Sequence, residues 1–175
     1  TEKTLSSRLI YEGRAIRVRV DTVQKPGGQE TTREIVEHAP CVVIVPVDGN
    51  EVLLVRQFRK PVEKELLELP AGGIDPGEDA ARAVIREMQE ETGFAPKKLV
   101  CLGGFYAAPG YGTEYLHLYL ATDLVPGQLY AEDTDEIEVV RVPLRRVKRL
   151  ITSGEIRDAK SIAGLLIYLE YRKKL

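Results

Sequence analysis

Tryptophan is absent from the chain, and cysteine, histidine and methionine are scarce, with two, two and one residues among 175. The two cysteines, Cys41 and Cys101, lie in apolar runs without metal-ligand spacing, so we expect two buried thiols. The longest apolar runs, residues 41–47 and 162–169, fall far short of the roughly 20 residues that cross a bilayer. No charged-then-apolar leader opens the chain. We therefore expect a protein of the reducing cytoplasm that has no membrane partner.

An excess of charge of either sign is also missing. The chain has 25 Lys and Arg residues against 27 Asp and Glu residues, a formal net charge of −2. Such a balance lacks the positive field that holds nucleic acid, so we expect no nucleic-acid partner. What is present is enough apolar sequence for a core, 43% of the residues, which is typical of one domain with at most a small appendage.

The N-terminal residues 1–38 have the pattern of strands only. Apolar and polar residues alternate over residues 16–23 and again over residues 31–37, and the intervening residues 25–28 are typical of a turn. This pattern predicts a small antiparallel hairpin. Because an isolated hairpin is marginally stable in water, we expect it to pack on the main body or on a second chain.

Both strands and helices are expected from residue 39 onward. The strands are predicted at residues 41–47, 52–55, 66–69, 99–105, 115–121 and 137–142, and the helices at 76–92, 143–153 and 158–172. Because the strands outnumber the helices and do not alternate regularly with them, we predict an α+β fold with a mixed β-sheet sandwiched between α-helices. The predicted domains are an N-terminal antiparallel β subdomain, residues 1–38, and a main domain, residues 39–175.

The helix predicted at residues 76–92 ends in a cluster of carboxylates. Glu87, Glu90 and Glu91 fall on one face, where like charges repel, and a helix C-terminus already carries partial negative charge. Arg86 can pair with Glu90 four residues on, but one arginine does not neutralise three acids. A hard divalent cation such as Mg²⁺ is therefore expected there, because it binds carboxylate oxygens and completes its shell with water and phosphates. A solvated acidic helix face is the alternative interpretation.

The residues around this cluster form a longer motif. Counted from Gly72, its fixed positions are Glu78, Arg86, Glu87, Glu90, Glu91 and Gly93, followed by Phe94. This spacing resembles the signature of the Nudix hydrolases, with Met88 where that family usually has an aliphatic residue. By this resemblance the catalytic acids and metal ligands are Glu87, Glu90 and Glu91, joined by the main-chain carbonyl of Ala71, and the ion is Mg²⁺ or Mn²⁺.

The same resemblance assigns roles to the neighbouring residues. Gly72 and Gly73 are expected to let the loop backbone approach the phosphates, and Arg86 is expected to orient the acids. For Glu78 two roles stay open, a capping box with Asp75 or contact with the metal. The implied reaction is attack of water on a diphosphate, assisted by the bound cation.

Four segments outside the motif resemble the ADP-ribose pyrophosphatase branch of that family. They are residues 32–38, 55–59 and 158–161, and the loop 108–114. By this resemblance Arg59 grips the diphosphate, and Arg33 and Glu34 contact the nucleoside end. Pro109 and Glu114 of the loop complete the expected substrate site. Some relatives swap their N-terminal hairpins between two chains, so we expect a homodimer.

An acidic stretch, residues 132–136, precedes the strand predicted at 137–142 and is the expected catalytic loop. The resemblance puts a catalytic acid at Asp135, with Glu136 adjacent, and an ordinary solvated loop is the alternative. The predicted function is hydrolysis of ADP-ribose or a related ADP-sugar to AMP and a sugar phosphate. Two alternatives stay open: the same chemistry on another nucleoside diphosphate, such as GDP-mannose or a dinucleotide, and a non-catalytic module that binds nucleotide sugars.

Overall fold

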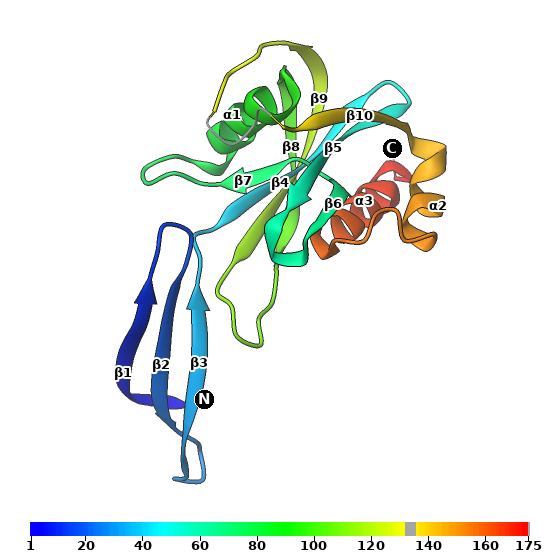
Figure 1. The fold of residues 1–175 in the computed structure, drawn as a ribbon. Coiled ribbons are helices and arrows are strands. Elements are labelled where there is room, and N and C mark those ends of the chain that lie inside the picture. The colour runs from blue at the N-terminus through cyan, green and yellow to red at the C-terminus, as the bar shows by residue number, and fades with distance from the viewer. Residues whose placement is uncertain (132–135, 175) are drawn as a thin grey trace. The chain divides into compact units, whose positions relative to one another are not determined.

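The computed structural model describes residues 1–131 and 136–174, and the chain forms two compact units (Figure 1). The first unit comprises Thr1–Pro40 and Tyr106–Tyr115, and the second comprises Cys41–Phe105 and Leu116–Leu175. Within the described residues, every helix is too short or too polar to span a lipid bilayer.

The first unit contains a three-stranded antiparallel sheet in the order β1-β2-β3. Its strands are β1 (Lys3–Glu12), β2 (Arg17–Gln24) and β3 (Glu30–Glu37). The predicted hairpin is confirmed as β2 and β3, whose register pairs Val20 with Glu34. The sequence pattern missed β1, because all ten of its residues are exposed and no alternation marks a buried face.

The second unit contains a mixed seven-stranded sheet. Its strands are β4 (Cys41–Asp48), β5 (Glu51–Arg59), β6 (Lys64–Glu68), β7 (Ala71–Gly73), β8 (Phe94–Tyr106), β9 (Tyr115–Pro126) and β10 (Glu138–Pro143). Five of them follow the order β10-β5-β4-β9-β8, while β6 pairs with β5 and β7 pairs with β4. β4 and β9 run parallel, whereas β5 is antiparallel to β4, β6 and β10. The prediction of a mixed sheet is therefore confirmed.

Helices cover both faces of this sheet (Figure 1). They are α1 (Ala80–Thr92), α2 (Val147–Thr152) and α3 (Ala159–Arg172), with 3₁₀ turns at η1 (Lys60–Val62) and η2 (Leu144–Arg146). In β4, Val43 and Val45 belong to the hydrophobic cluster of α2 and α3, while Val42 and Ile44 belong to that of α1. Because successive side chains of a strand point to opposite faces, one apolar run builds both layers. Burial of each such side chain contributes about 1.5 to 3 kcal/mol to the free energy of unfolding. The helices on both faces confirm the predicted sandwich.

Two helix predictions are wrong at their starts. α1 begins at Ala80 rather than at residue 76, and it is capped by Asp79, whose side chain accepts the main-chain N–H of Arg82 at 2.9 Å. Residues 75–78 form a turn instead, because Gly77 has a φ of 83°, outside the helical region. The helix predicted over residues 143–153 is shortened to α2, preceded by η2.

The prediction of two buried cysteines is half right. Cys41 is buried in β4, whereas Cys101 is exposed on β8. β8 is the last strand in the sheet order, and an edge strand is not covered on its outer side. Apolar neighbours in the sequence therefore did not ensure burial of this thiol.

Candidate active site

The predicted metal ligands lie together on the C-terminal half of α1, within the second unit. Glu87 is buried, with 8% of its surface exposed, and Glu90 and Glu91 are partly buried. The Glu87 carboxylate lies directly against the main chain of β7, so that a methyl group at Gly72 would overlap it. The close approach of this acid therefore requires glycine at position 72, a reason that the sequence pattern did not reveal.

Arg86 is the cation at the centre of the cluster. Its Nη1 donates to Glu87 Oε1 at 2.6 Å and to Glu90 Oε2 at 3.2 Å, so the expected pair with Glu90 is present. Its Nε and Nη2 donate to the two oxygens of Glu78 at 3.1 and 2.9 Å, and Nη2 also donates to the Gly73 carbonyl at 2.7 Å. One guanidinium thus joins three carboxylates of the motif to the glycine loop.

Glu91 is held in a different way. The main-chain N–H of Ala71 donates to its Oε2 at 3.2 Å. Burial, together with the negative charge of Glu87, raises the pKa of Glu91 to about 8, against the opposing effects of the Ala71 N–H, Arg59 and Lys160. A carboxyl group in this state ionises at neutral pH when a cation binds beside it.

The donor set fits a divalent cation. Burial raises the pKa of Glu87 in turn; Arg86 opposes this shift, and the charges of Glu90 and Glu78 add to it. Arg86 supplies one positive charge to Glu78, Glu87 and Glu90, so these acids carry more negative charge than Arg86 balances when they are ionised. Their ligand atoms are carboxylate oxygens, and the Ala71 carbonyl belongs to the adjoining strand β7. An oxygen-only set of this kind suits Mg²⁺ or Mn²⁺.

Of the two roles left open for Glu78, the structure bears on the capping box with Asp75. Its Oε2 accepts the main-chain N–H of Asp75 at 3.1 Å, as in a capping box, but this contact closes the turn 75–78 and not the start of a helix. The cap of α1 is Asp79. The hydrogen bonds from Arg86 hold the pKa of Glu78 below its ordinary value, so Glu78 is a charged partner of Arg86.

Arg59, the predicted diphosphate ligand, lies at the C-terminal end of β5. Its Nε and Nη2 donate to Glu68 at 2.9 and 2.7 Å. Glu68 is buried at the end of β6 and also binds Lys160 of α3. The sequence analysis missed Glu68, although one signal was available: it is a charged residue inside the apolar run of residues 66–69, where a buried charge requires a partner.

Three predicted substrate residues lie together in the first unit. Arg33, Glu34 and Pro109 line a cavity of about 250 Å³, together with Tyr111 and residues near it. The Nε of Arg33 also donates to Glu2 at 3.1 Å. The structure therefore brings β3 and the loop with Pro109 together, as a shared binding site requires.

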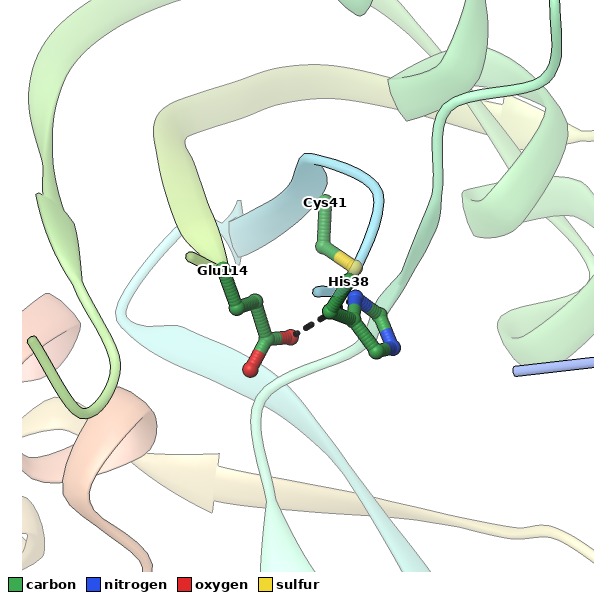
Figure 2. A group of neighbouring side chains, drawn as sticks. All are labelled: His38, Cys41 and Glu114. Atoms are coloured by element: carbon green, nitrogen blue, oxygen red, sulfur yellow. Dashed lines mark ion pairs between the residues drawn. The ribbon is translucent and has the colours of Figure 1, made fainter. Parts of the chain in front are cut away.

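The remaining predicted residues are placed separately. Glu114, also in the first unit, has its Oε1 3.8 Å from Nδ1 of His38 (Figure 2). Thr113 Oγ1 accepts the main-chain N–H of His38 at 3.0 Å, which fixes the end of this loop next to the end of β3. Glu136 is exposed in a turn just before β10, and Asp135 lies outside the described residues.

The raised pKa of Glu91 has a measurable consequence for the metal-free protein. Because the folded value of about 8 lies above the ordinary 4.5, the folded state binds more protons between these values, and the free energy of unfolding falls as the pH rises from about 5 to about 8. The contribution is at most about 1.4 kcal/mol per pH unit. Urea unfolding in EDTA at several pH values measures it, and Glu91→Gln should lack this slope. Equal slopes in the two proteins would contradict the burial of this carboxyl group.

Comparisons with known proteins find two matching family models and several similar proteins. A family model described as NUDIX domain matches residues 37–165, and one described as nucleoside diphosphate sugar hydrolase N-terminal domain matches residues 2–36. An ADP-ribose pyrophosphatase of Bacillus subtilis (strain 168) is 38% identical, and a methanol dehydrogenase activator of Bacillus methanolicus is 34% identical; each alignment covers 99% of this chain and 95% of the relative. A crystal structure of an ADP compounds hydrolase matches with a TM-score of 0.91 at 26% identity, covering 99% of this chain and 95% of that one.

Proposed function

Because the chain belongs to the Nudix hydrolase family, we propose that it is an enzyme that hydrolyses the diphosphate bond of ADP-ribose or a closely related ADP-sugar to AMP and a sugar phosphate. The observation that carries the proposal is the cluster of Glu87, Glu90 and Glu91 at the end of α1. The negative charge of these acids, when they are ionised, exceeds the positive charge of Arg86, and the acids lie in the part of the chain that the NUDIX family model matches. The named relatives supply the choice of an ADP compound as substrate.

The divalent cation of the reaction is Mg²⁺ in this proposal. Glu87, Glu90, Glu91 and the Ala71 carbonyl would hold it, and when bound it would polarise a phosphoryl oxygen, activate the attacking water and neutralise the leaving phosphate. The chain contributes the arrangement of the acids. Arg86 fixes the side chains of Glu87 and Glu90, and the main chain of β7 fixes that of Glu91.

The predicted substrate residues keep their expected roles in this proposal. Arg59 binds the diphosphate, because a guanidinium forms paired hydrogen bonds with phosphate oxygens. Arg33 and Glu34 bind the nucleoside end in the cavity that they line with Pro109. The proposed acceptor of the proton from the attacking water is one of the last two acids of the predicted catalytic loop, Asp135 or the adjacent Glu136.

Hydrolysis of a panel of nucleoside diphosphate compounds in ¹⁸O-labelled water tests the proposal. We expect ADP-ribose to have the highest kcat/KM, and the product that carries ¹⁸O identifies the phosphorus attacked. Faster cleavage of GDP-mannose or a dinucleotide would contradict ADP-ribose as the substrate but would still support hydrolysis of a nucleoside diphosphate. Tight binding of ADP-ribose with no product over hours in Mg²⁺ would overturn the proposed reaction and indicate a nucleotide-sugar binding module.

We also propose that the protein is a homodimer in which the first unit contributes the contact. β1 exposes several large apolar side chains, with exposed fractions of 42% for Leu5, 48% for Leu9 and 57% for Tyr11. An exposed strand with apolar side chains offers both unpaired main-chain groups and an apolar surface to a partner. A second copy of the same sheet can cover both.

The Leu9→Glu variant should therefore be monomeric where the wild-type protein is dimeric. A carboxylate in the middle of an apolar contact loses its hydration without gaining a partner. The dissociation constant should rise by about 30-fold or more, the effect of losing a contact worth about 2 kcal/mol. Sedimentation equilibrium measures it, with Val100→Glu, exposed on β8, as the control. A wild-type monomer, or an unchanged dimer in Leu9→Glu, would contradict the proposed contact.

A further inference from the structure

One carboxylate outside the proposed metal cluster has almost no exposed surface. Glu68, at the C-terminal end of β6, is only 1% exposed. An ionised carboxylate is stable at such a depth only when cations and hydrogen bonds replace its water. Burial alone would raise the pKa of Glu68, but Arg59 and Lys160 hold it below the ordinary value. Glu68 is therefore a permanent anion at neutral pH.

Two cations from different elements meet at this anion. Arg59 of β5 donates from Nε to Oε1 at 2.9 Å and from Nη2 to Oε2 at 2.7 Å, a two-pronged contact that fixes the plane of the guanidinium. Lys160, near the start of α3, donates to the same Oε2 and to Asp158 Oδ2 at 2.8 Å. Asp158 is itself fixed as the N-cap of α3, where it accepts the main-chain N–H of Ser161 at 3.1 Å. A single carboxylate thus joins β5, β6 and α3.

Counted over residues 1–131 and 136–174, both cations retain donors for a second anion. A guanidinium has two edges that can each bind two oxygens, and Glu68 occupies only the edge formed by Nε and Nη2. The side chain of Arg59 is 38% exposed, so its other edge can reach a ligand. The ammonium group of Lys160 has three donors, of which Glu68 and Asp158 take two. Each cation is therefore fixed by carboxylates and still able to bind phosphate.

This group adjoins the metal cluster in the same unit. Two residues separate Glu68 from Ala71, whose N–H donates to Glu91 at 3.2 Å. The N–H of Leu69, between them, donates to Ser161 Oγ at 2.7 Å and fixes this segment on α3. The charges of Arg59 and Lys160 both act on Glu91. The two cations therefore lie within electrostatic reach of the acid expected to bind the cation.

We propose that Glu68 is a positioning residue that holds Arg59 and Lys160 as a fixed pair of cations for the diphosphate of the substrate. The inference rests on the proposed function, because it takes a nucleoside diphosphate as the ligand. Lys160 joins Arg59 as a phosphate-binding residue, and Glu68 acts through both without touching the substrate. Because the pair is arranged before the substrate arrives, little binding free energy is lost in ordering two long side chains.

The variant Glu68→Gln tests this role. The amide keeps the shape but loses the charge and replaces one acceptor oxygen by a donor, so it cannot hold both cations. The KM for ADP-ribose should rise by about 10- to 100-fold, and kcat should change by less than about threefold, as expected when ground-state and transition-state binding are lost together. The affinity for inorganic pyrophosphate, measured calorimetrically in EDTA, should fall by a similar factor. Glu68→Asp keeps the charge and should recover part of both losses.

A double-variant background separates positioning from a general structural role. In Arg59→Ala/Lys160→Met, the further change Glu68→Gln should leave KM where it is, because the two cations through which Glu68 acts are gone. Leu150→Ala is the matched control for lost stability, since it opens a cavity in the core at α2 and should leave KM unchanged. A further rise of KM in the triple variant would overturn the inference.

An unchanged KM and an unchanged pyrophosphate affinity in Glu68→Gln would also overturn it. If that variant does not fold, the single variant Lys160→Met provides the test. We expect its KM to rise by about tenfold. An unchanged KM would contradict the proposal. The failure of the proposed function looks different. In that case the wild-type protein would bind pyrophosphate, lose this binding in Glu68→Gln, and hydrolyse no nucleoside diphosphate.

Discussion

The Glu91→Gln variant should lose about 10²- to 10³-fold in kcat with Mg²⁺ while its fold stays intact. Glutamine has the shape of glutamate but lacks the negative charge that, in the proposed function, binds the cation and through it stabilises the charge of the transition state. In the metal-free protein, burial opposes the charge of Glu91 and raises its pKa to about 8. The amide of glutamine is neutral, so the variant does not bear the cost of burying a charge at this position. We therefore expect a free energy of unfolding, in EDTA at pH 8, equal to or higher than that of the wild-type protein.

Initial rates with ADP-ribose and urea unfolding of the same preparations measure the two effects together. The matched control is Glu170→Gln, the same change at a carboxylate whose side chain is 66% exposed on α3, and it should keep full activity. Turnover of Glu91→Gln within about threefold of the wild type, far below the loss expected for such a group, would contradict the metal-binding role. Lost turnover with a lower free energy of unfolding would contradict the burial argument.

The Arg86→Ala variant should lower the free energy of unfolding of the metal-free protein by about 3 kcal/mol. The reason is that Arg86 links Glu78, Glu87 and Glu90, and its loss removes the cation that is paired with the buried Glu87. Mg²⁺ should restore part of the lost stability, because it neutralises the same acids. Urea unfolding in EDTA and in Mg²⁺ measures both numbers.

Arg82→Ala is the matched control for Arg86→Ala. Arg82 lies one turn earlier on α1 and forms an exposed ion pair with Asp79 at 3.5 Å, with 79% of its side chain exposed. Such surface pairs contribute little, so the variant should lie within about 0.5 kcal/mol of the wild type. Equal destabilisation by the two substitutions would contradict a central role of Arg86.

The parts of the fold that the sequence predicted are those with strong local patterns. The apolar run that became β4 is buried on both faces, as a run without polar alternation indicates. The end of α1 at Gly93 follows from the left-handed conformation, with a φ of 76°, that glycine adopts readily. The grouping of Glu87, Glu90 and Glu91 follows from helical spacing alone, because residues three and four apart share a face.

The parts that the sequence did not predict depend on contacts between distant residues or on missing patterns. β1 has no buried face, so its ten residues show no periodicity that distinguishes a strand from a loop. The partners of Glu68 come from Arg59, nine residues before it, and from Lys160, 92 residues after it, and spacing cannot reveal such a pair. The resemblance pointed to Arg59 as a phosphate ligand, and the structure adds the buried carboxylate that holds it.

Anomalous diffraction from a crystal grown with Mn²⁺ and a non-hydrolysable analogue of ADP-ribose is the most direct test of the metal site. We predict manganese at the C-terminal end of α1, coordinated by Glu87, Glu90, Glu91 and the Ala71 carbonyl and in contact with the diphosphate. Manganese bound elsewhere, with no contact to Glu87, Glu90 or Glu91, would contradict this prediction.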